Sequence, residues 1–518
     1  MAGLAVAAVA AALMPRALVG VFYDDGIYLA LARSLAEGHG YRLLYLPGAP
    51  EAVHYPPLYP VFLAVLWKIW PSFPDDVALF RAANAVALGL FAGVFAAYLR
   101  RRRALSAGVA AAAALLLATA VPLLAVTTVL FAEPLFLALA AGAWWLADAA
   151  GDARGRRALG LAAAAGAVAG LAALTRSIGV SVVAGTVLAL AVGRHRREAV
   201  AAAGAAAVLL LPWAMWAAVH RAGVEPVLQA GYGTYGDLLR QAGWGWLTPD
   251  ALWDVLRPLG AVALSTVAPA WRDLAGAPAL AVLVVGAIVL TRRAPAVGWS
   301  LACYLVVVLL WPYGPDRFLW AALPVLGVSM VVGTAALWRA GAGRKGRVRW
   351  LLRSLALSGA LPVLAGFVVY QANGFARGWT TSAQRGISRS FEQIVPWVRE
   401  TLPASAVLAG EDEALLWLYT GRRAVPSFLW RVEGRVARAY PADTLRAFFD
   451  RAGVTHVVIT GLRSEAAPAI DELLQRYRGY LRTVMMWPGP MMALSVDAGV
   501  TAVTSPPPSP PPSSPPPR

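Results

Sequence analysis

The chain has 518 residues, of which 59% are hydrophobic and only 14% are charged, and its mean hydropathy is +0.61. A soluble domain is about 45–50% apolar and about 25% charged, so this composition excludes a cytosolic enzyme and indicates an integral membrane protein. The net charge of +17 comes almost entirely from arginines, which fall in short clusters between apolar stretches. That pattern is typical of membrane topology rather than of nucleic-acid binding. The single cysteine, Cys303, excludes an intrachain disulfide and a thiolate metal cluster.

Eleven apolar stretches approach the roughly 20 residues that a helix needs to cross a bilayer. They lie at 2–22, 77–99, 104–124, 129–149, 158–174, 177–193, 199–219, 274–291, 297–312, 318–338 and 350–370. Arginine clusters follow alternate stretches, at 100–103, 154–157, 194–197, 292–293 and 339–349. All five clusters are cytoplasmic if the amino terminus is inside, as the positive-inside rule requires. We therefore predict an all-α polytopic bundle of about eleven transmembrane helices in residues 1–370, with everything after Tyr370 outside.

Two outer loops are expected between these spans. In loop 23–76, the stretch 57–71 is apolar, but it is short, bracketed by prolines and carries Lys68. If it crossed the membrane, every later arginine cluster would face outward, so we interpret it as a helix in the outer interface. The stretch 26–37 predicts a second interfacial helix. The other large outer loop, 220–273, is rich in Gly, Trp and Tyr.

The sequence changes character after the last span. Residues 371–498 have mixed charge, strand-like runs at 406–410 and 455–460, and helical stretches at 441–452 and 465–479. We predict a small extracytoplasmic α/β domain there, which we expect to help bind the acceptor. The nearly balanced charge of this domain gives no support to nucleic-acid binding. Residues 499–518 are proline-rich low-complexity sequence, for which we expect an extended, disordered tail.

Five charged residues fall at the outer membrane face in the predicted topology. They are Asp24, Asp25, Glu133, Arg176 and Arg317. Charged groups are costly in or against a bilayer, so each needs a reason. Arginine would bind a phosphate through its bidentate fork, and a carboxylate would act as a base. This set suits an anionic lipid headgroup and a polar acceptor.

Each of these residues also has a structural interpretation. The Asp24–Asp25 pair could cap the next helix, and Glu133, which precedes Pro134, could complement a helix dipole. Arg176 could extend toward the headgroups, and Arg317 could pair with neighbouring residues or with lipid. His54, in the run HYPP, is more typical of a loop residue than of a metal ligand, because no second histidine stands at metal spacing.

Several motifs resemble the GT-C superfamily of glycosyltransferases, in particular the branch of protein O-mannosyltransferases and lipid A aminoarabinose transferases. The first outer loop carries YDDGIYLALARSLAEGHGY, HYPPLYPVFL and FRAANAVALGL. Later motifs are FAEPLFLAL, LTRSIG and DRFLWAALP, and the carboxy-terminal ones are VPWVRETLP, LYTGRRAVP and LRAFFDRAGVTHVVI. The resemblance spans most of the chain, and the order and sidedness of the motifs supply its specificity.

This resemblance implies a polyprenyl-phosphate sugar donor and glycosyl transfer with inversion. By position, Asp24 resembles the proposed general base, with Asp25 in support, and Glu133 matches an acidic residue near the sugar. Arg176 and Arg317 would neutralise the lipid phosphate. The phosphate leaves as a stable anion, so one base suffices, unlike the acid–base pair of glycoside hydrolysis. A second carboxylate, Asp25 or Glu133, would either raise the pKa of the base or bind the sugar, and both options stay open.

The chain departs from the aminoarabinose branch before the paired prolines. His54 and Tyr55 replace the acidic–basic pair there. A phosphate or metal contact at these two residues is therefore an open question, and so is the acceptor class. We expect no cofactor; a divalent cation is possible, but ligand spacing does not support one.

The expected function is that of a multi-pass plasma-membrane glycosyltransferase. Its partners would be the lipid bilayer, a polyprenyl-phosphate sugar and a hydroxyl acceptor on a protein, a lipid or a cell-envelope polysaccharide. The alternatives are a lipid-linked sugar transporter or flippase, a metal-dependent oligosaccharyl or arabinosyl type transferase, and a non-catalytic scaffold. A transporter would favour charges near the membrane midplane and inverted repeats, and the sequence has neither feature.

Overall fold

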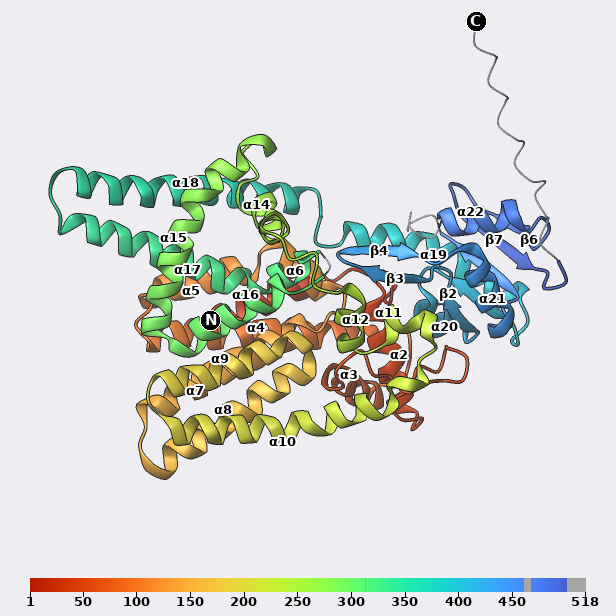
Figure 1. The fold of residues 1–518 in the computed structure, drawn as a ribbon, viewed down its shortest axis with the longest axis horizontal. Coiled ribbons are helices and arrows are strands. Elements are labelled where there is room, and N and C mark those ends of the chain that lie inside the picture. The colour runs from red at the N-terminus through yellow and green to blue at the C-terminus, as the bar shows by residue number, and fades with distance from the viewer. Residues whose placement is uncertain (313, 461–466, 501–518) are drawn as a thin grey trace, which may run out of the picture.

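The computed structural model describes residues 1–312, 314–460 and 467–500 and consists mainly of helices (Figure 1). Every predicted span coincides with a helix or a pair of helices. These helices are α1 (Ala2–Ala12), α4 (Val77–Arg101), α5 (Ala107–Ala118), α6 (Val121–Thr128), α7 (Glu133–Asp152), α8 (Gly155–Thr175), α9 (Val180–Val192), α10 (Arg196–His220), α15 (Arg272–Arg293), α16 (Pro295–Leu309), α17 (Asp316–Ala342) and α18 (Gly346–Ala376). The polytopic helical bundle that the sequence predicts is confirmed.

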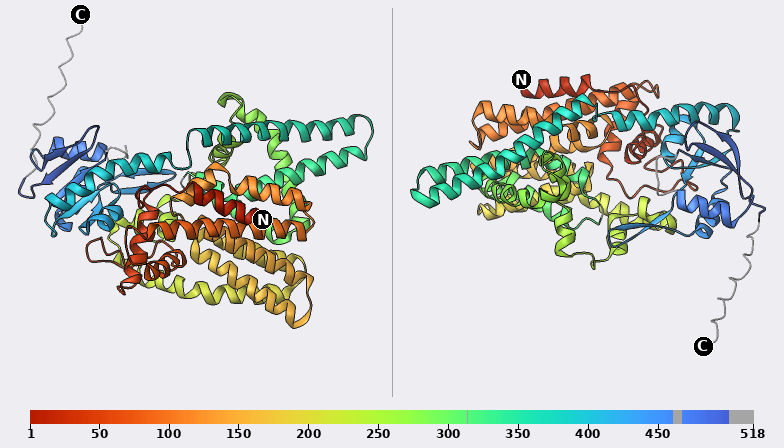
Figure 2. Two further views of the ribbon diagram at one scale, coloured as in Figure 1. Left: turned by 180° about the vertical axis from the view of Figure 1, so that it is seen from behind. Right: turned by 90° about the horizontal axis from the view of Figure 1, so that it is seen from above.

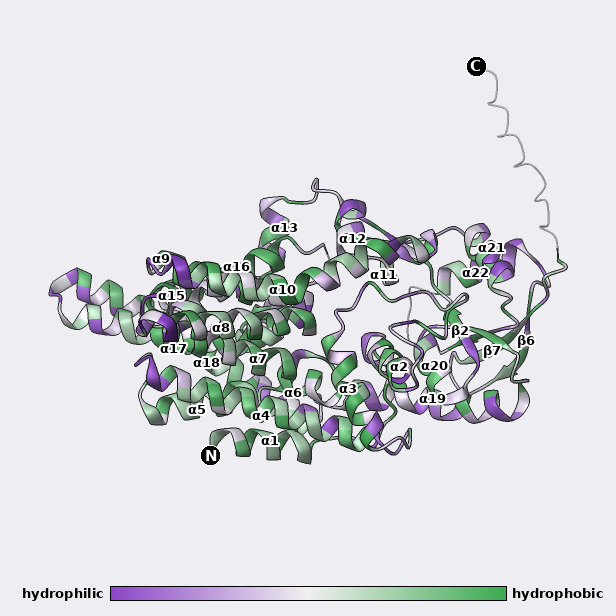
Figure 3. Ribbon diagram, turned by 90° about the horizontal axis from the view of Figure 1, so that it is seen from below, coloured by the Kyte–Doolittle hydropathy of each residue, from purple (hydrophilic) through white to green (hydrophobic). Residues whose placement is uncertain are grey.

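Seven helices in the described part of the chain are long and apolar enough to cross a membrane, or eight if the bent pair α5–α6 is one span. The other predicted spans, at α1, at Ser177–Val192 and at α16, are shorter apolar helices. Apolar residues predominate along the bundle (Figure 3). The outward sides of α10, α15 and α18 are largely exposed, as expected for surfaces that lipid covers.

Two predicted spans differ in detail from the helices that form. The span 2–22 is helical only to Ala12, because Pro15 has no amide hydrogen to donate to Ala11 and its ring would clash with that carbonyl. The span 104–124 bends by 56° between α5 and α6, where Pro122 cannot donate to the carbonyl of Ala118. Hydropathy detects both segments but not these breaks.

The first outer loop forms the two predicted helices, α2 (Asp24–Ala36) and α3 (Leu58–Ile69). The second outer loop forms only short helices. They are η2 (Arg221–Gly223), η3 (Pro226–Leu228), α11 (Gln229–Tyr232), α12 (Tyr235–Ala242), α13 (Pro249–Asp254), α14 (Arg257–Ala263) and η4 (Pro269–Trp271), and η1 (Ser177–Gly179) joins α8 to α9.

The carboxy-terminal region is the predicted α/β domain. Its helices are α19 (Ser382–Thr401), α20 (Glu413–Thr420), α21 (Ala442–Ala452) and α22 (Ala467–Arg476). Its strands are β1 (Val407–Gly410), β2 (Arg423–Pro426), β3 (Trp430–Glu433), β4 (Val436–Ala439), β5 (His456–Ile459), β6 (Leu481–Met486) and β7 (Met492–Val496). The sheet order is β2-β1-β5-β7-β6, with β2, β1 and β5 parallel and β7 antiparallel to both of its neighbours. The ribbon β3–β4 is separate. Helix α18 runs past the expected boundary at 370, and most of the predicted tail lies outside the described residues.

The α/β domain lies at one end of the bundle's long axis in every view (Figures 1 and 2). The arginine-bearing turns α7–α8, α9–α10, α15–α16 and α17–α18 lie at the other end (Figure 1). There, Arg102 donates to the carbonyl of Arg293 and to the carboxylate of Asp152, which links three of the clustered turns. The charged residues predicted for the outer face occupy the end beside the α/β domain.

Candidate active site

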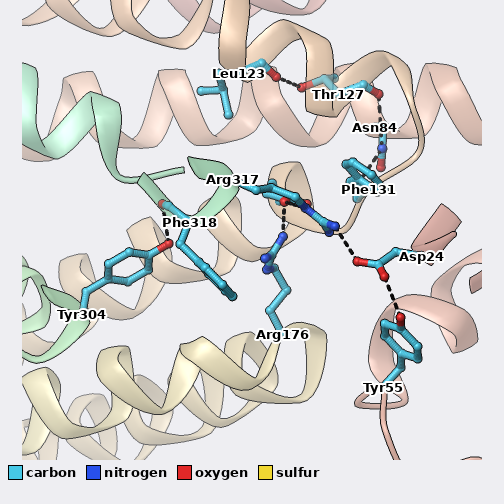
Figure 4. Close-up of polar contacts among 11 residues, drawn as sticks. Asp24, Tyr55, Asn84, Leu123, Thr127, Phe131, Arg176, Tyr304, Arg317 and Phe318 are labelled. Atoms are coloured by element: carbon cyan, nitrogen blue, oxygen red, sulfur yellow. Dashed lines mark hydrogen bonds and ion pairs between the residues drawn. The ribbon is translucent and has the colours of Figure 1, made fainter. Parts of the chain in front are cut away.

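Asp24 is the first residue of α2, and its carboxylate faces both the bundle and the first outer loop (Figure 4). Its Oδ1 accepts a hydrogen bond of 2.5 Å from the Tyr55 hydroxyl, and its Oδ2 accepts one from Nη1 of Arg317. No side-chain capping bond forms at the start of α2, so the helix-cap interpretation does not apply to Asp24. Burial opposes the charge, but Arg317 and the Tyr55 hydroxyl outweigh it and lower the pKa of Asp24 below its ordinary value.

Glu133 is the centre of a buried ion-pair network. It begins α7, its side chain is fully buried, and its Oε1 pairs with both Arg176 and Arg317. The distance from Nε of Arg317 to this oxygen is 2.5 Å. Arg176, between α8 and η1, is only 8% exposed, so it points inward and does not extend to the headgroups. Four residues from distant parts of the sequence thus form one ion-pair network, in which Arg317 bridges the carboxylates of Asp24 and Glu133.

Aromatic rings flank both guanidinium groups. Arg317 lies over the Phe131 ring, with 3.6 Å between its Cζ and the ring centroid, and Arg176 lies 5.4 Å from the centroid of Phe318. Such cation–π contacts stabilise and orient the cations where water is scarce. The side chains of Arg317 and Asp24 keep exposed fractions of 25% and 23%, so a ligand can reach this part of the network.

The Asp25 carboxylate binds backbone amides. Its Oδ2 accepts a hydrogen bond of 2.7 Å from the amide of Gly20, and its Oδ1 accepts one of 2.9 Å from the amide of Phe22. Asp25 therefore does not cap α2 either; it fixes the backbone that leads to Asp24. Burial raises the pKa of Asp25 to about 7.

His54 and Tyr55 line the loop beside Asp24. The His54 ring lies against Tyr55 and Tyr235, with centroid distances of 4.8 and 4.5 Å, and its Nδ1 is 2.6 Å from the carbonyl oxygen of Gly233. Burial lowers the pKa of His54, which favours the neutral ring. In place of the acidic–basic pair that the resemblance to the aminoarabinose branch implies, this chain has the imidazole of His54 and the phenol of Tyr55, which donates to Asp24. Within the described ranges, no group of three or more His, Cys, Asp or Glu side chains could hold a metal ion.

Polar residues that the sequence analysis did not select hold the ends of the site helices. The Asn84 side chain donates to the carbonyls of Thr127 and Phe131, at 3.4 and 3.1 Å, and so fixes the turn before Glu133. Tyr304 donates to the carbonyl of Phe318 at 2.7 Å and fixes the start of α17 (Figure 4). Asn84 is a fully buried polar residue inside an apolar span, and that signal could have identified it.

A cavity lies beside the site, between the second outer loop and the α/β domain. Its lining includes Tyr23, Tyr232, Glu413 and Trp430. Tyr23 directly precedes Asp24, and the Tyr232 hydroxyl donates to Glu413. Its volume is about 40 Å³, which is room for a few water molecules and too small for a sugar ring.

Comparison with known proteins yields structural neighbours only. No family model and no curated protein sequence matches the chain. The crystal structure of ArnT from Cupriavidus metallidurans in the apo state is similar, with a TM-score of 0.53 and 16% identity over 96% of this chain and 97% of that one. The same protein bound to undecaprenyl phosphate gives a TM-score of 0.51 and 15% identity over the same shares. The chain therefore shares the fold of these structures, and the fold that the sequence resemblance implies is confirmed.

Proposed function

We propose that this protein is an integral-membrane inverting glycosyltransferase. It moves a sugar from a polyprenyl-phosphate donor to an acceptor hydroxyl on a protein, a lipid or a cell-envelope polysaccharide. The GT-C fold supports this class, and the ArnT neighbour that was crystallised with undecaprenyl phosphate supports the type of donor. The observation that carries the proposal is the partly exposed Asp24 carboxylate, held by Tyr55 beside Arg317 and its buried partner Glu133.

In the proposed reaction, Asp24 removes the proton of the acceptor hydroxyl as its oxygen attacks the anomeric carbon. The bond between the anomeric carbon and the phosphate oxygen breaks on the opposite face of the sugar, which inverts the configuration. The polyprenyl phosphate leaves as an anion, and Arg317 and Arg176 stabilise the charge that develops on it. Glu133 keeps both guanidinium groups in place, since a buried unpaired arginine would be costly.

The membrane orientation belongs to the same proposal. Because the arginine-bearing turns lie at the end opposite the site, the positive-inside rule places them in the cytoplasm and the site on the extracytoplasmic side. The amino terminus is then cytoplasmic and the α/β domain extracytoplasmic.

The decisive experiment uses purified protein, a panel of radiolabelled polyprenyl-phosphate sugars and candidate acceptors, with Asp24→Asn as the test variant. We expect this variant to lose label transfer by at least about a thousandfold, because it lacks the base, while it still binds polyprenyl phosphate. Asp75→Asn is the matched control, because it makes the same change at an exposed position outside the network. Full transfer by Asp24→Asn would contradict the assignment of the base.

The same assay separates the alternatives. A flippase or a scaffold would give no covalent transfer with any donor, whereas a metal-dependent transferase would lose activity in chelator and regain it with added cation. The charged residues of the network lie at the ends of α2, α7, α8 and α17 rather than at the middles of these helices, which favours a transferase over a transporter.

A further inference from the structure

The segment that leads to Asp24 has no regular secondary structure. Residues 13–23 follow α1 and contain only turns and bends before α2 begins at Asp24. Backbone groups in such a segment need partners from elsewhere. The bundle supplies Arg81, whose Nη1 and Nη2 donate to the carbonyls of Pro15 and Ala17 at 2.5 and 2.8 Å.

Further partners come from the carboxy-terminal domain. The amide of Leu18 donates to Oγ of Ser388 at 2.9 Å, and the amide of Val19 donates to the Tyr419 hydroxyl at 3.1 Å. Gln384 donates to the carbonyl of Leu18 at 3.0 Å. Three side chains on α19 and α20, more than 360 residues away in sequence, therefore fix two consecutive residues of this segment.

Close backbone packing reinforces these bonds. Gly20 has a φ of +88°, and a Cβ added to it would lie 3.3 Å from Cβ of Leu415 on α20. A Cβ on Gly26, in the first turn of α2, would lie 3.2 Å from Cβ of Ala414. Helix α20 therefore packs directly on the loop and on the helix that carry Asp24, and a side chain at either glycine would make a neighbour shift by a few tenths of an ångström.

The backbone just before Asp24 adopts an unfavourable conformation. Tyr23 has a φ of 66°, which is uncommon for a residue with a side chain and persists only where surrounding contacts enforce it. The hydrogen bonds of Asp25 to Gly20 and Phe22 supply part of that constraint from within the loop. The bonds from α19 and α20 anchor the same loop from outside it.

We infer that the carboxy-terminal domain is required for the transfer step itself, with Tyr419 and Ser388 as positioning residues that hold residues 18–23 and so aim the Asp24 carboxylate. This role rests on the proposed function of Asp24 as the base. It adds to the expectation that the domain helps bind the acceptor. A base that is displaced by a fraction of an ångström loses alignment with the hydroxyl that it must deprotonate.

The test compares Tyr419→Phe and Ser388→Ala with a matched control, Tyr477→Phe, in the full-length protein. Tyr477 belongs to the same domain and donates to Asp443, away from residues 18–23. Both test variants should lower kcat by about tenfold, because a misaligned base stabilises the transition state less, and leave the KM for the donor nearly unchanged. The control should keep the kcat of the wild type. Thermal unfolding of all three variants shows whether a loss of kcat reflects a loss of the fold.

Hydrogen exchange gives a second readout that does not depend on activity. Amides of peptides covering residues 15–28 should exchange faster in Tyr419→Phe and Ser388→Ala than in the control. The inference is overturned if exchange is unchanged, or if kcat in both test variants equals that of the control. If the wild type transfers no sugar from any donor, the proposed function fails, and the exchange data alone still decide whether the domain holds this segment.

Discussion

The hydrogen bond from Tyr55 to Asp24 offers the sharpest test of the proposed base. Tyr55→Phe removes one hydroxyl and keeps the ring, which is almost fully buried against Tyr28 and His54. A hydrogen bond to an ionised group is worth about 1.5–3 kcal/mol. Because Asp24 keeps Arg317 and is 23% exposed, the lower part of that range applies, about 1.5–2 kcal/mol.

The sign of the effect follows from the protonation states. The Tyr55 hydroxyl stabilises the ionised Asp24, so its loss raises the pKa of that carboxyl. The base must be ionised to accept a proton, and the variant therefore loses activity at a higher pH than the wild type does. On the acid side of the profile, kcat/KM should fall by about ten- to thirtyfold relative to the wild type, while at high pH the two should nearly coincide.

The assay is the pH dependence of label transfer at donor concentrations below KM. Tyr98→Phe is the control, because Tyr98 also donates to a buried aspartate, Asp148, but at the opposite end of the bundle. The Tyr98→Phe variant should lose activity at the same acidic pH as the wild type. An unchanged acid limb in Tyr55→Phe, or an equal loss at every pH, would refute the identification of Asp24 as the titrating base.

Three further predictions concern the supports of the site. Glu133→Gln should lower the unfolding free energy by about 3–5 kcal/mol, because Arg176 and Arg317 lose their shared buried partner; an unchanged Tm in detergent would contradict this. Asp25 has its pKa raised by burial to about 7 from 3.8, so its contribution to stability is complete below about pH 4 and is lost as the pH rises through about 7. The Tm should therefore fall over that interval, and Asp25→Asn should flatten the slope; equal slopes would show that another group is responsible. Asn84→Ala frees the two carbonyls before α7 and should lower kcat at least about tenfold with the fold retained, measured by transfer and by thermal unfolding.

The sequence predicts the order and position of the membrane helices well, because hydropathy and the distribution of arginines between alternate loops are properties of whole segments. Each predicted span contains a helix, and the strand-like runs at 406–410 and 455–460 form β1 and β5. The same reasoning places Asp24, Glu133, Arg176 and Arg317 at one end of the bundle. That placement needs only the order of the spans, since alternate helix ends must meet at the same face.

The pairing of these charges and the path of residues 13–23 could not be read from the sequence. Hydropathy does not distinguish an apolar helix from an apolar coil, so it does not reveal that α1 ends at Ala12. Adjacent Asp24 and Asp25 look equivalent in the sequence. In the structure, Asp24 accepts from Arg317, whereas Asp25 accepts from the amides of Gly20 and Phe22, and this difference depends on the folded path of the loop before α2.

The charges of the network constrain how the proposed reaction begins. The charges of the two carboxylates and the two guanidinium groups sum to zero before the donor binds. A phosphate that binds here must therefore share an arginine that already has a carboxylate partner. Arg176 is almost fully buried with Glu133, whereas Arg317 is partly exposed and bridges Asp24 to Glu133. The phosphate therefore competes with Asp24 for Arg317. In the proposed reaction, an Arg317 that is shared with the donor phosphate lowers the pKa of Asp24 less, so the carboxylate becomes a stronger base once a sugar phosphate is in place.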